Sequence, residues 1–180
     1  MRTVTGIALA LVTMMATGAM AAEKKGTDNP ETPIGETKAL NAMDIAAVYL
    51  NPIEMEPHGI DMAASQADVH LEVDVHAAEG NPNGFGAGEW IPALTITYRL
   101  ENKDTGKTEN GTLMPMVAAD GPHYGSNVKM LGTGNYHVSF HIDNPQRQGF
   151  GRHTDKATGV GPWFQPFSVD YDFSYVPKKK

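Results

Sequence analysis

The stretch "DVHLEVDVHA", residues Asp68–Ala77, alternates apolar and polar side chains without a break. Successive side chains of a β-strand point to opposite faces, so strict alternation is typical of a strand with one buried face. The residues predicted to point into a core are Val69, Leu71, Val73 and Val75. The stretch therefore predicts a β protein, in which the histidines and carboxylates of the strand lie on its other face.

Three further stretches show the same alternation: "ALTITYRL" (Ala93–Leu100), "NYHVSFHID" (Asn135–Asp143) and "FSVDYDFSYV" (Phe167–Val176). Turns rich in glycine, proline and polar residues separate them, and no long helical period is present. Short strands at near-regular spacing, each apolar on one face, favour two packed antiparallel sheets. We therefore predict an all-β fold, an immunoglobulin-like antiparallel β-sandwich with added loops, seven or more strands and Trp90 in its core.

The N-terminus predicts export. Arg2 precedes the apolar run "IALALVTMMATGAMA", which ends in small residues, as secretory signal peptides do. We expect a signal peptide over residues 1–21, a flexible polar arm over residues 22–46 and one immunoglobulin-like domain over residues 47–180. Of the 14 basic and 21 acidic residues only Arg2 lies in the signal, which leaves 13 against 21. Such an acidic chain is a poor nucleic-acid binder and a reasonable partner for cations.

The chain has no cysteine and seven histidines. A blue-copper electron-transfer site needs a cysteine thiolate, so that class of site is excluded. Methionine and histidine together still leave copper and iron as candidate metals. The catalytic motifs G-x-S-x-G and H-E-x-x-H are absent, so the sequence indicates neither of those two classes of active site.

The stretch "MPMVAADGPHYG" (Met114–Gly125) predicts a hairpin whose reversal brings Met116 to face His123, with Asp120 in the turn. A thioether beside an imidazole suits copper better than zinc or calcium. Packing of a methionine under a turn is the alternative interpretation. The residues themselves do not decide between Met114 and Met116 as the facing thioether.

Two other places could contribute ligands. His70 and Glu72 share one strand face, because they are two residues apart; they form either a site or an ordinary solvated surface. His153 lies in the glycine-rich stretch "GFGRHTDKATGV", where a solvent-exposed loop histidine is the simpler interpretation.

Taken together, "ADVHLEVDVHA", "NGFGAGEWIPALTI", "GTLMPMVAADGPHYGSNVKM", "YHVSFHI" and "GFGRHTDKATGV" resemble the bacterial periplasmic iron-transport protein family. The likeness runs from about Val48 to Tyr175. The resemblance implies a homodimeric immunoglobulin-like sandwich in the periplasm, with copper and iron as bound metals and a high-affinity iron permease of the inner membrane as partner. The metal ligands that it implies are His70, Glu72, Met116, Asp120, His123 and His153.

The resemblance thus settles on Met116 rather than Met114, and it implies that His153 completes the site from the partner subunit. The expected function is binding of copper and iron and presentation of iron to the permease, with Fe(II) oxidation as a further hypothesis. A periplasmic protein that buffers or delivers copper is the alternative, and a purely structural sandwich is a third.

Overall fold

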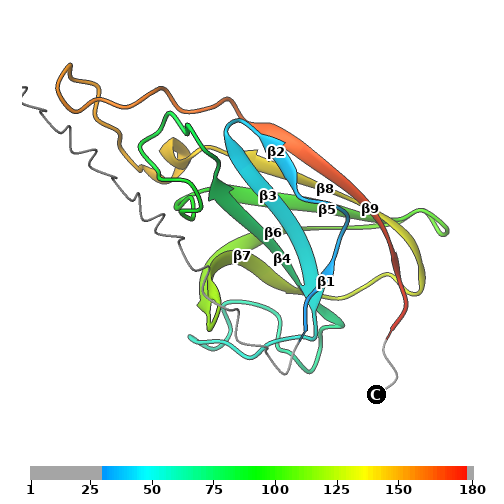
Figure 1. Ribbon diagram of the computed structural model, residues 1–180. Helices are drawn as coiled ribbons and strands as arrows, with labels where there is room; N and C mark the ends of the chain where they lie inside the picture. Colours follow the sequence, from blue (N-terminus) through cyan, green and yellow to red (C-terminus); the bar gives the residue numbers. More distant parts are fainter. Residues whose placement is uncertain (1–29, 178–180) are drawn as a thin grey trace, which may run out of the picture.

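The computed structural model describes residues 30–177, which form nine strands and one short 3-10 helix (Figure 1). The elements are, in chain order, β1 (Thr32–Pro33), β2 (Lys38–Leu40), β3 (Met43–Leu50), β4 (Val69–Ala77), β5 (Thr95–Asn102), β6 (Lys107–Ala118), β7 (Gly121–Val128), β8 (Gly134–Asp143), η1 (Pro145–Gln148) and β9 (Phe167–Tyr175). All strand pairs are antiparallel, which confirms the predicted all-β class.

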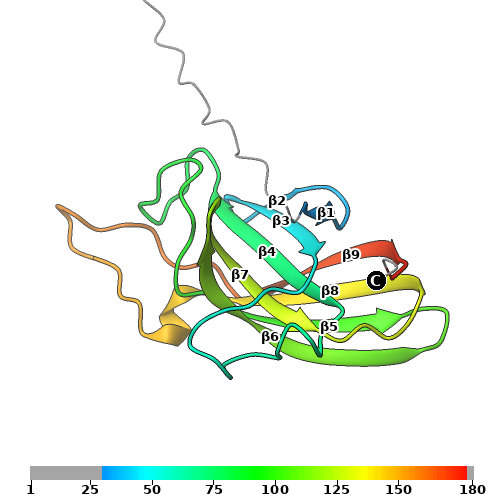
Figure 2. The ribbon, with the colours of Figure 1, turned by 90° about the horizontal axis from the view of Figure 1, so that it is seen from below.

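The strands form two layers that share β6 (Figure 2). The sheet order is β1-β3-β4-β7-β6-β5-β8-β9, and β2 also pairs with β3. Residues 107–113 of β6 pair with β5, and residues 114–118 pair with β7. The sheet therefore folds over at Met114 and forms a curled sandwich. The immunoglobulin-like character of this sandwich stays a prediction.

The apolar faces predicted from alternation form the core between the layers. Val69, Leu71, Val73 and Val75 of β4 are all buried, as are the inward residues of β5 and β8. The Tyr171 hydroxyl of β9 donates to the Ile45 carbonyl of β3 at 2.9 Å and ties one layer to the other. Trp90 packs on the rim of this core, half-buried and stacked on Tyr124 at 5.0 Å between ring centroids.

The prediction of a flexible polar arm over residues 22–46 is wrong for its later part. Residues 32–33 and 38–40 pair with β3, which itself begins at Met43. Ile34, between the two short strands, is fully buried in the core. Burial of Ile34 and the backbone pairing of both short strands with β3 together hold this segment on the sheet. The signal peptide predicted over residues 1–21 lies outside the described residues.

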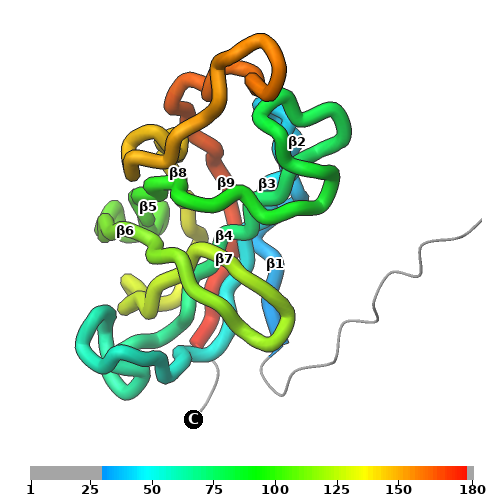
Figure 3. The backbone as a smooth tube through the Cα atoms, turned by 90° about the vertical axis from the view of Figure 1, so that its left-hand side faces the viewer, coloured from blue at the N-terminus to red at the C-terminus, as the bar shows by residue number. Residues whose placement is uncertain are grey.

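Two long loops pack against each other at one end of the sandwich (Figure 3). They connect β4 to β5 and η1 to β9, and the Asn83 side chain of the first donates to the Gly161 carbonyl of the second at 2.9 Å. The Gly161 amide donates in return to the Pro82 carbonyl at 2.7 Å. Over residues 30–177, no helix is long and apolar enough to cross a membrane.

Candidate metal centre

The candidate site lies on the outward face of the sheet formed by β4, β7 and the second half of β6. Glu72 of β4 lies opposite Gly125 of β7, which in turn lies opposite Met114 of β6. Met116 lies opposite His123, as the hairpin prediction requires. The turn consists of Ala119 and Asp120, and β7 starts at the next residue. The hairpin interpretation of the sequence is therefore confirmed.

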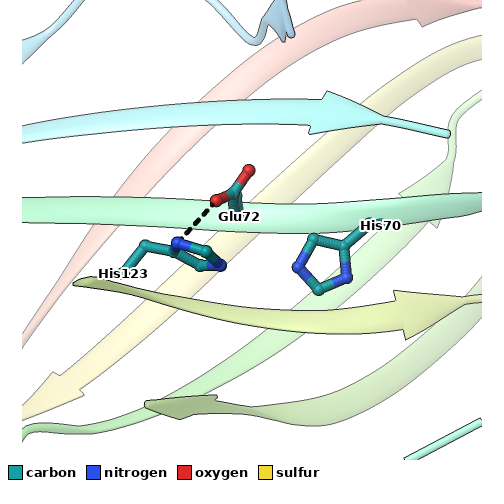
Figure 4. A group of neighbouring side chains, drawn as sticks. All are labelled: His70, Glu72 and His123. Carbon is teal, nitrogen blue, oxygen red and sulfur yellow. Dashed lines mark ion pairs between the residues drawn. The ribbon is translucent and has the colours of Figure 1, made fainter. Parts of the chain in front are cut away.

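Three side chains come together on this face: His70, Glu72 and His123 (Figure 4). Each offers one potential ligand atom, and these atoms lie within 4.8 Å of one another. His70 is 1% exposed, Glu72 5% and His123 4%. The interpretation of His70 and Glu72 as a solvated surface is therefore wrong. Alternation of side chains reveals a strand face, but it does not reveal whether a loop covers that face.

The covering segment is the loop between β3 and β4, which is fastened to β7 by Asp61. The Asp61 carboxylate accepts from the backbone amide of Asn127 at 2.6 Å and from the Ser126 hydroxyl at 2.9 Å. It also accepts from the backbone amide of Met62 at 2.7 Å. This chain segment therefore stays over the end of the strand face where His70 lies.

The His70 imidazole is oriented by Asn127, whose side-chain oxygen lies 3.2 Å from Nδ1. Its other ring nitrogen, Nε2, is buried and finds no hydrogen-bond partner among the described residues. Burial lowers the pKa of His70, while Glu72 and Asn127 raise it by smaller amounts. The ring is therefore neutral at pH 7, the form in which imidazole binds a metal.

The His123 imidazole is oriented by Glu72, because its Nδ1 lies 3.0 Å from a Glu72 carboxylate oxygen (Figure 4). An ionised carboxylate only accepts hydrogen bonds, so Nδ1 is the protonated nitrogen. Burial alone would lower the pKa of His123, but the hydrogen bond and negative charge of Glu72 together raise it. In the neutral ring Nε2 carries the lone pair, and it too is buried without a partner within residues 30–177.

Gly125 makes room for this arrangement. A Cβ atom at position 125 would lie 2.4 Å from His70 Nε2 and 3.4 Å from Glu72 Cγ. The backbone of Gly125 does not adopt a positive φ, so any residue could take its conformation. The absence of a side chain is what leaves space for the His70 ring.

The methionines complete the outward face from β6. Met114 and Met116 are both half-buried and lie two residues apart, so they share the face of His123. Directly opposed residues of an antiparallel pair have Cβ atoms about 4.5–5.5 Å apart, which places the Met116 thioether within reach of His123. Asp120 lies exposed in the turn and is not one of the three clustered residues.

The structure does not bring His153 to the cluster. Its side chain is 75% exposed in the loop after η1. Its Nδ1 lies 2.8 Å from the Thr158 hydroxyl, which donates its own proton to Asp155 at 2.7 Å. The hydroxyl must therefore accept from Nδ1, so that nitrogen carries a proton.

Sequence reasoning missed three residues that shape the site: Asp61, Gly125 and Asn127. The sequence of β7 contained part of this information, because Gly125 and Asn127 follow His123 at intervals of two and therefore share its strand face. Asp61 gave no signal, since its partners are 65 and 66 residues away in the sequence.

The arrangement has the chemistry of a transition-metal site. Two imidazoles present buried, unpartnered nitrogens, and a carboxylate or amide oxygen orients each ring through its other nitrogen. Metal-binding histidines are almost always held in this way. A nearby thioether adds a soft ligand, and the carboxylate adds a hard one. The residues present therefore fit a metal ion.

The family model described as "Fe2+ transport protein" matches residues 28–177. A UPF0423 protein of Brucella abortus (strain 2308) is 51% identical over 154 residues, which cover 84% of this chain and 85% of that one.

Two solved structures are also similar. The copper-reconstituted P19 protein from Campylobacter jejuni has a TM-score of 0.82 and 61% identity, covering 84% of this chain and 99% of the other. A copper-bound variant of FetP from uropathogenic Escherichia coli strain F11 has a TM-score of 0.82 and 59% identity, covering 84% and 96%. The family match spans all of the described residues, and the chain belongs to the Fe2+ transport protein family.

Proposed function

We propose that this protein is a periplasmic metal-binding component of iron uptake. It binds copper through His70, His123 and Met116 with Glu72 beside them, binds iron as cargo, and presents that iron to an inner-membrane permease. The proposal rests most on one observation: Nε2 of His70 and Nε2 of His123 are both buried without a partner in the part of the chain described. An unsatisfied buried polar atom costs about 1–3 kcal/mol, and a bound metal would remove that cost at both atoms.

Copper is favoured by the ligand set and by the similar proteins. Two imidazoles and a thioether suit copper, whereas calcium and magnesium take oxygen ligands. P19, which is 61% identical, has been reconstituted with copper, and a FetP variant is copper-bound. Copper, when bound, supplies a soft to borderline centre that exchanges one electron.

Iron is favoured as cargo by the family and by the carboxylates. The Glu72 oxygen that accepts from His123 leaves a second oxygen for an ion, and Asp120 lies exposed in the neighbouring turn. Carboxylates are hard ligands, which suit iron better than the thioether does. The predicted signal peptide and the expression of FetP in the periplasm support the periplasm as the compartment of this chain.

His153 is proposed to act from the partner subunit of a homodimer. Its Nδ1 is hydrogen-bonded to Thr158 within its own loop, which leaves Nε2 as the ring nitrogen outside that contact, and the side chain is exposed. A site completed across a dimer binds copper more weakly when dilution separates the subunits. Copper affinity that does not depend on protein concentration, in wild type and in a monomeric variant, would reject this role.

The test is a metal titration of the metal-free mature chain. Cu(II) and Fe(II) are titrated separately into wild type and into the double variant Met116→Ala/His123→Ala. We expect about one copper ion per chain in wild type and none in the double variant, with weaker Fe(II) binding retained on the carboxylates. If wild type binds neither metal above background, the proposed function is wrong.

Oxidation of Fe(II) is a further hypothesis for the same site. In that reaction Fe(II) gives up one electron to the copper-loaded protein, and dissolved oxygen is the final acceptor. Fe(III) should then form faster with copper-loaded wild type than with His123→Ala. Equal rates would reject oxidation and leave metal binding intact.

Copper buffering or delivery is the second candidate function, and the imidazole–thioether combination is the observation that favours it. The two functions differ in the phenotype of a deletion strain. Loss of an iron-uptake protein impairs growth under iron starvation, whereas loss of a copper-buffering protein impairs growth under copper stress.

A further inference from the structure

We propose that Asn127 is a positioning residue that fixes the His70 imidazole with its Nε2 lone pair directed into the metal site. The metal itself rests on the proposed function, but the effect of Asn127 on the His70 ring is a property of the metal-free protein.

Asn127 is 3% exposed, and the orientation of its side chain is fixed by three contacts with the backbone. Its nitrogen donates to the carbonyls of Ile53 and Met62, both at 2.8 Å. Its oxygen accepts from the Ile53 amide at 3.1 Å. A backbone amide can only donate and a carbonyl can only accept, so a flipped side chain would place like against like at all three contacts.

This orientation determines the tautomer of His70. The Asn127 atom at 3.2 Å from Nδ1 is the oxygen, which has no proton to give. Nδ1 must therefore carry the proton, and the lone pair must lie on Nε2. Nε2 is the nitrogen that lies over Gly125, where a Cβ would approach it to 2.4 Å. The asparagine thus selects which ring nitrogen is left to bind an ion.

The orientation also depends on the covering loop. Ile53 and Met62 belong to the loop that Asp61 fastens to the backbone of Asn127 and to Ser126. The loop holds the side-chain amide of Asn127, and that amide in turn orients the imidazole ring of His70. His70 is in this way coupled to a segment that contributes no ligand in the proposed site.

The chain offers a matched control in Asn102. This asparagine is fully buried, donates to the carbonyls of Leu131 and Thr133 at 3.3 Å, and accepts from the amide of Asp104 at 3.0 Å. It holds a loop as Asn127 does, but its side chain is hydrogen-bonded to no histidine within residues 30–177. Its loss should cost folding stability without affecting the metal site.

The experiment compares wild type with Asn127→Leu, Asn127→Asp and Asn102→Leu. The first measurement is the nitrogen NMR spectrum of the His70 ring in metal-free protein, which distinguishes a protonated from an unprotonated nitrogen. The second is the affinity for Cu(II), measured in competition with a chelator of known strength. Asn127→Asp keeps an acceptor for Nδ1 but loses both donated hydrogen bonds to the loop.

We expect wild type and Asn102→Leu to show a protonated Nδ1 and equal copper affinity. Asn127→Leu should lose this signature and bind copper about 10–100-fold more weakly, as is typical when the partner of a metal-binding histidine is removed. Asn127→Asp should keep the signature and remain within a few-fold of wild-type affinity.

Two results would overturn the proposal. One is an unchanged His70 signature and affinity in Asn127→Leu. The other is loss of the protonated-Nδ1 signature of His70 in Asn127→Asp, because that would show that the loop and not the acceptor orients the ring. This second result also decides the matter if Asn127→Leu does not fold. Absence of copper binding in wild type would instead contradict the proposed function, and the NMR measurement would still decide the role of Asn127.

Discussion

Gly125→Ala is a small perturbation aimed at the centre of the site. The added methyl group would start 2.4 Å from His70 Nε2 and 2.8 Å from His70 Cε1. Ordinary contacts of a Cβ begin near 3.4 Å, and contacts below 3.0 Å are essentially never seen. The ring must therefore retreat by roughly 0.6–1.0 Å, although it is 1% exposed and hydrogen-bonded to Asn127.

The shift has two measurable consequences. Forcing a methyl group into a packed site typically costs about 1–3 kcal/mol of folding free energy, which urea denaturation measures. Metal–ligand distances tolerate deviations of about 0.2 Å, so a displaced His70 should weaken copper binding at least tenfold, or about 1.4 kcal/mol. Chelator competition measures this second quantity.

Gly111→Ala is the matched control. A Cβ at position 111 would lie 2.5 Å from the Tyr98 ring, and Gly111 also lacks a positive φ. The clash is as close as at Gly125, but it occurs on the core side, so the control should lose stability and keep its copper affinity. Wild-type copper affinity in Gly125→Ala would refute the assignment of His70 Nε2 as a ligand.

Three further predictions concern the thioether, the layers and pH. Met116→Leu should weaken copper binding about tenfold or more in a chelator competition, while Met114→Leu should stay within a few-fold of wild type; equal losses would reject the choice of Met116. Tyr171→Phe removes the hydroxyl that joins β9 to β3 and should cost about 1 kcal/mol in urea denaturation, and an unchanged midpoint would contradict this. The pKa of His70 is lowered from 6.5 by burial, so its contribution to stability is complete above pH 6.5 and is lost as pH falls below that value. Burial lowers the pKa of His123, but Glu72, Asp74 and the Gly121 backbone together raise it to a greater extent, so the contribution of His123 is complete below pH 6.5 and is lost as pH rises through the raised pKa. Urea titrations of metal-free wild type and Glu72→Gln from pH 5 to 8 should therefore differ most at the acidic end, and parallel profiles would contradict the Glu72–His123 pairing.

The strands were predictable because their alternation is a local property. In "DVHLEVDVHA" the alternation of apolar and polar residues assigns each side chain to one face of the strand, and the apolar face of β4 is buried as expected. The hairpin at Asp120 was predictable for the same reason, since turn residues lie between two short runs. The family resemblance, confirmed by the match over residues 28–177, joined residues of these separate elements into one expected set of metal ligands.

Other features were not predictable, because they depend on long-range contacts. The passage of β6 from one layer to the other at Met114 depends on which strand lies beside each half. The burial of His70 depends on a loop that is held by Asp61, some 65 residues from its partners. Ile34 was overlooked within a polar segment because a single apolar residue has no period. The roles of Asp120 and His153 as ligands stay predictions.

The most direct test of the central claim is X-ray absorption at the copper edge of the copper-loaded protein, for wild type and for Met116→Leu. The account predicts one sulfur and at least two imidazole nitrogens around copper in wild type, with a third imidazole where His153 completes the site, and loss of the sulfur alone in the variant. A wild-type spectrum with no sulfur, or with a single imidazole, would contradict a site built from His70, His123 and Met116.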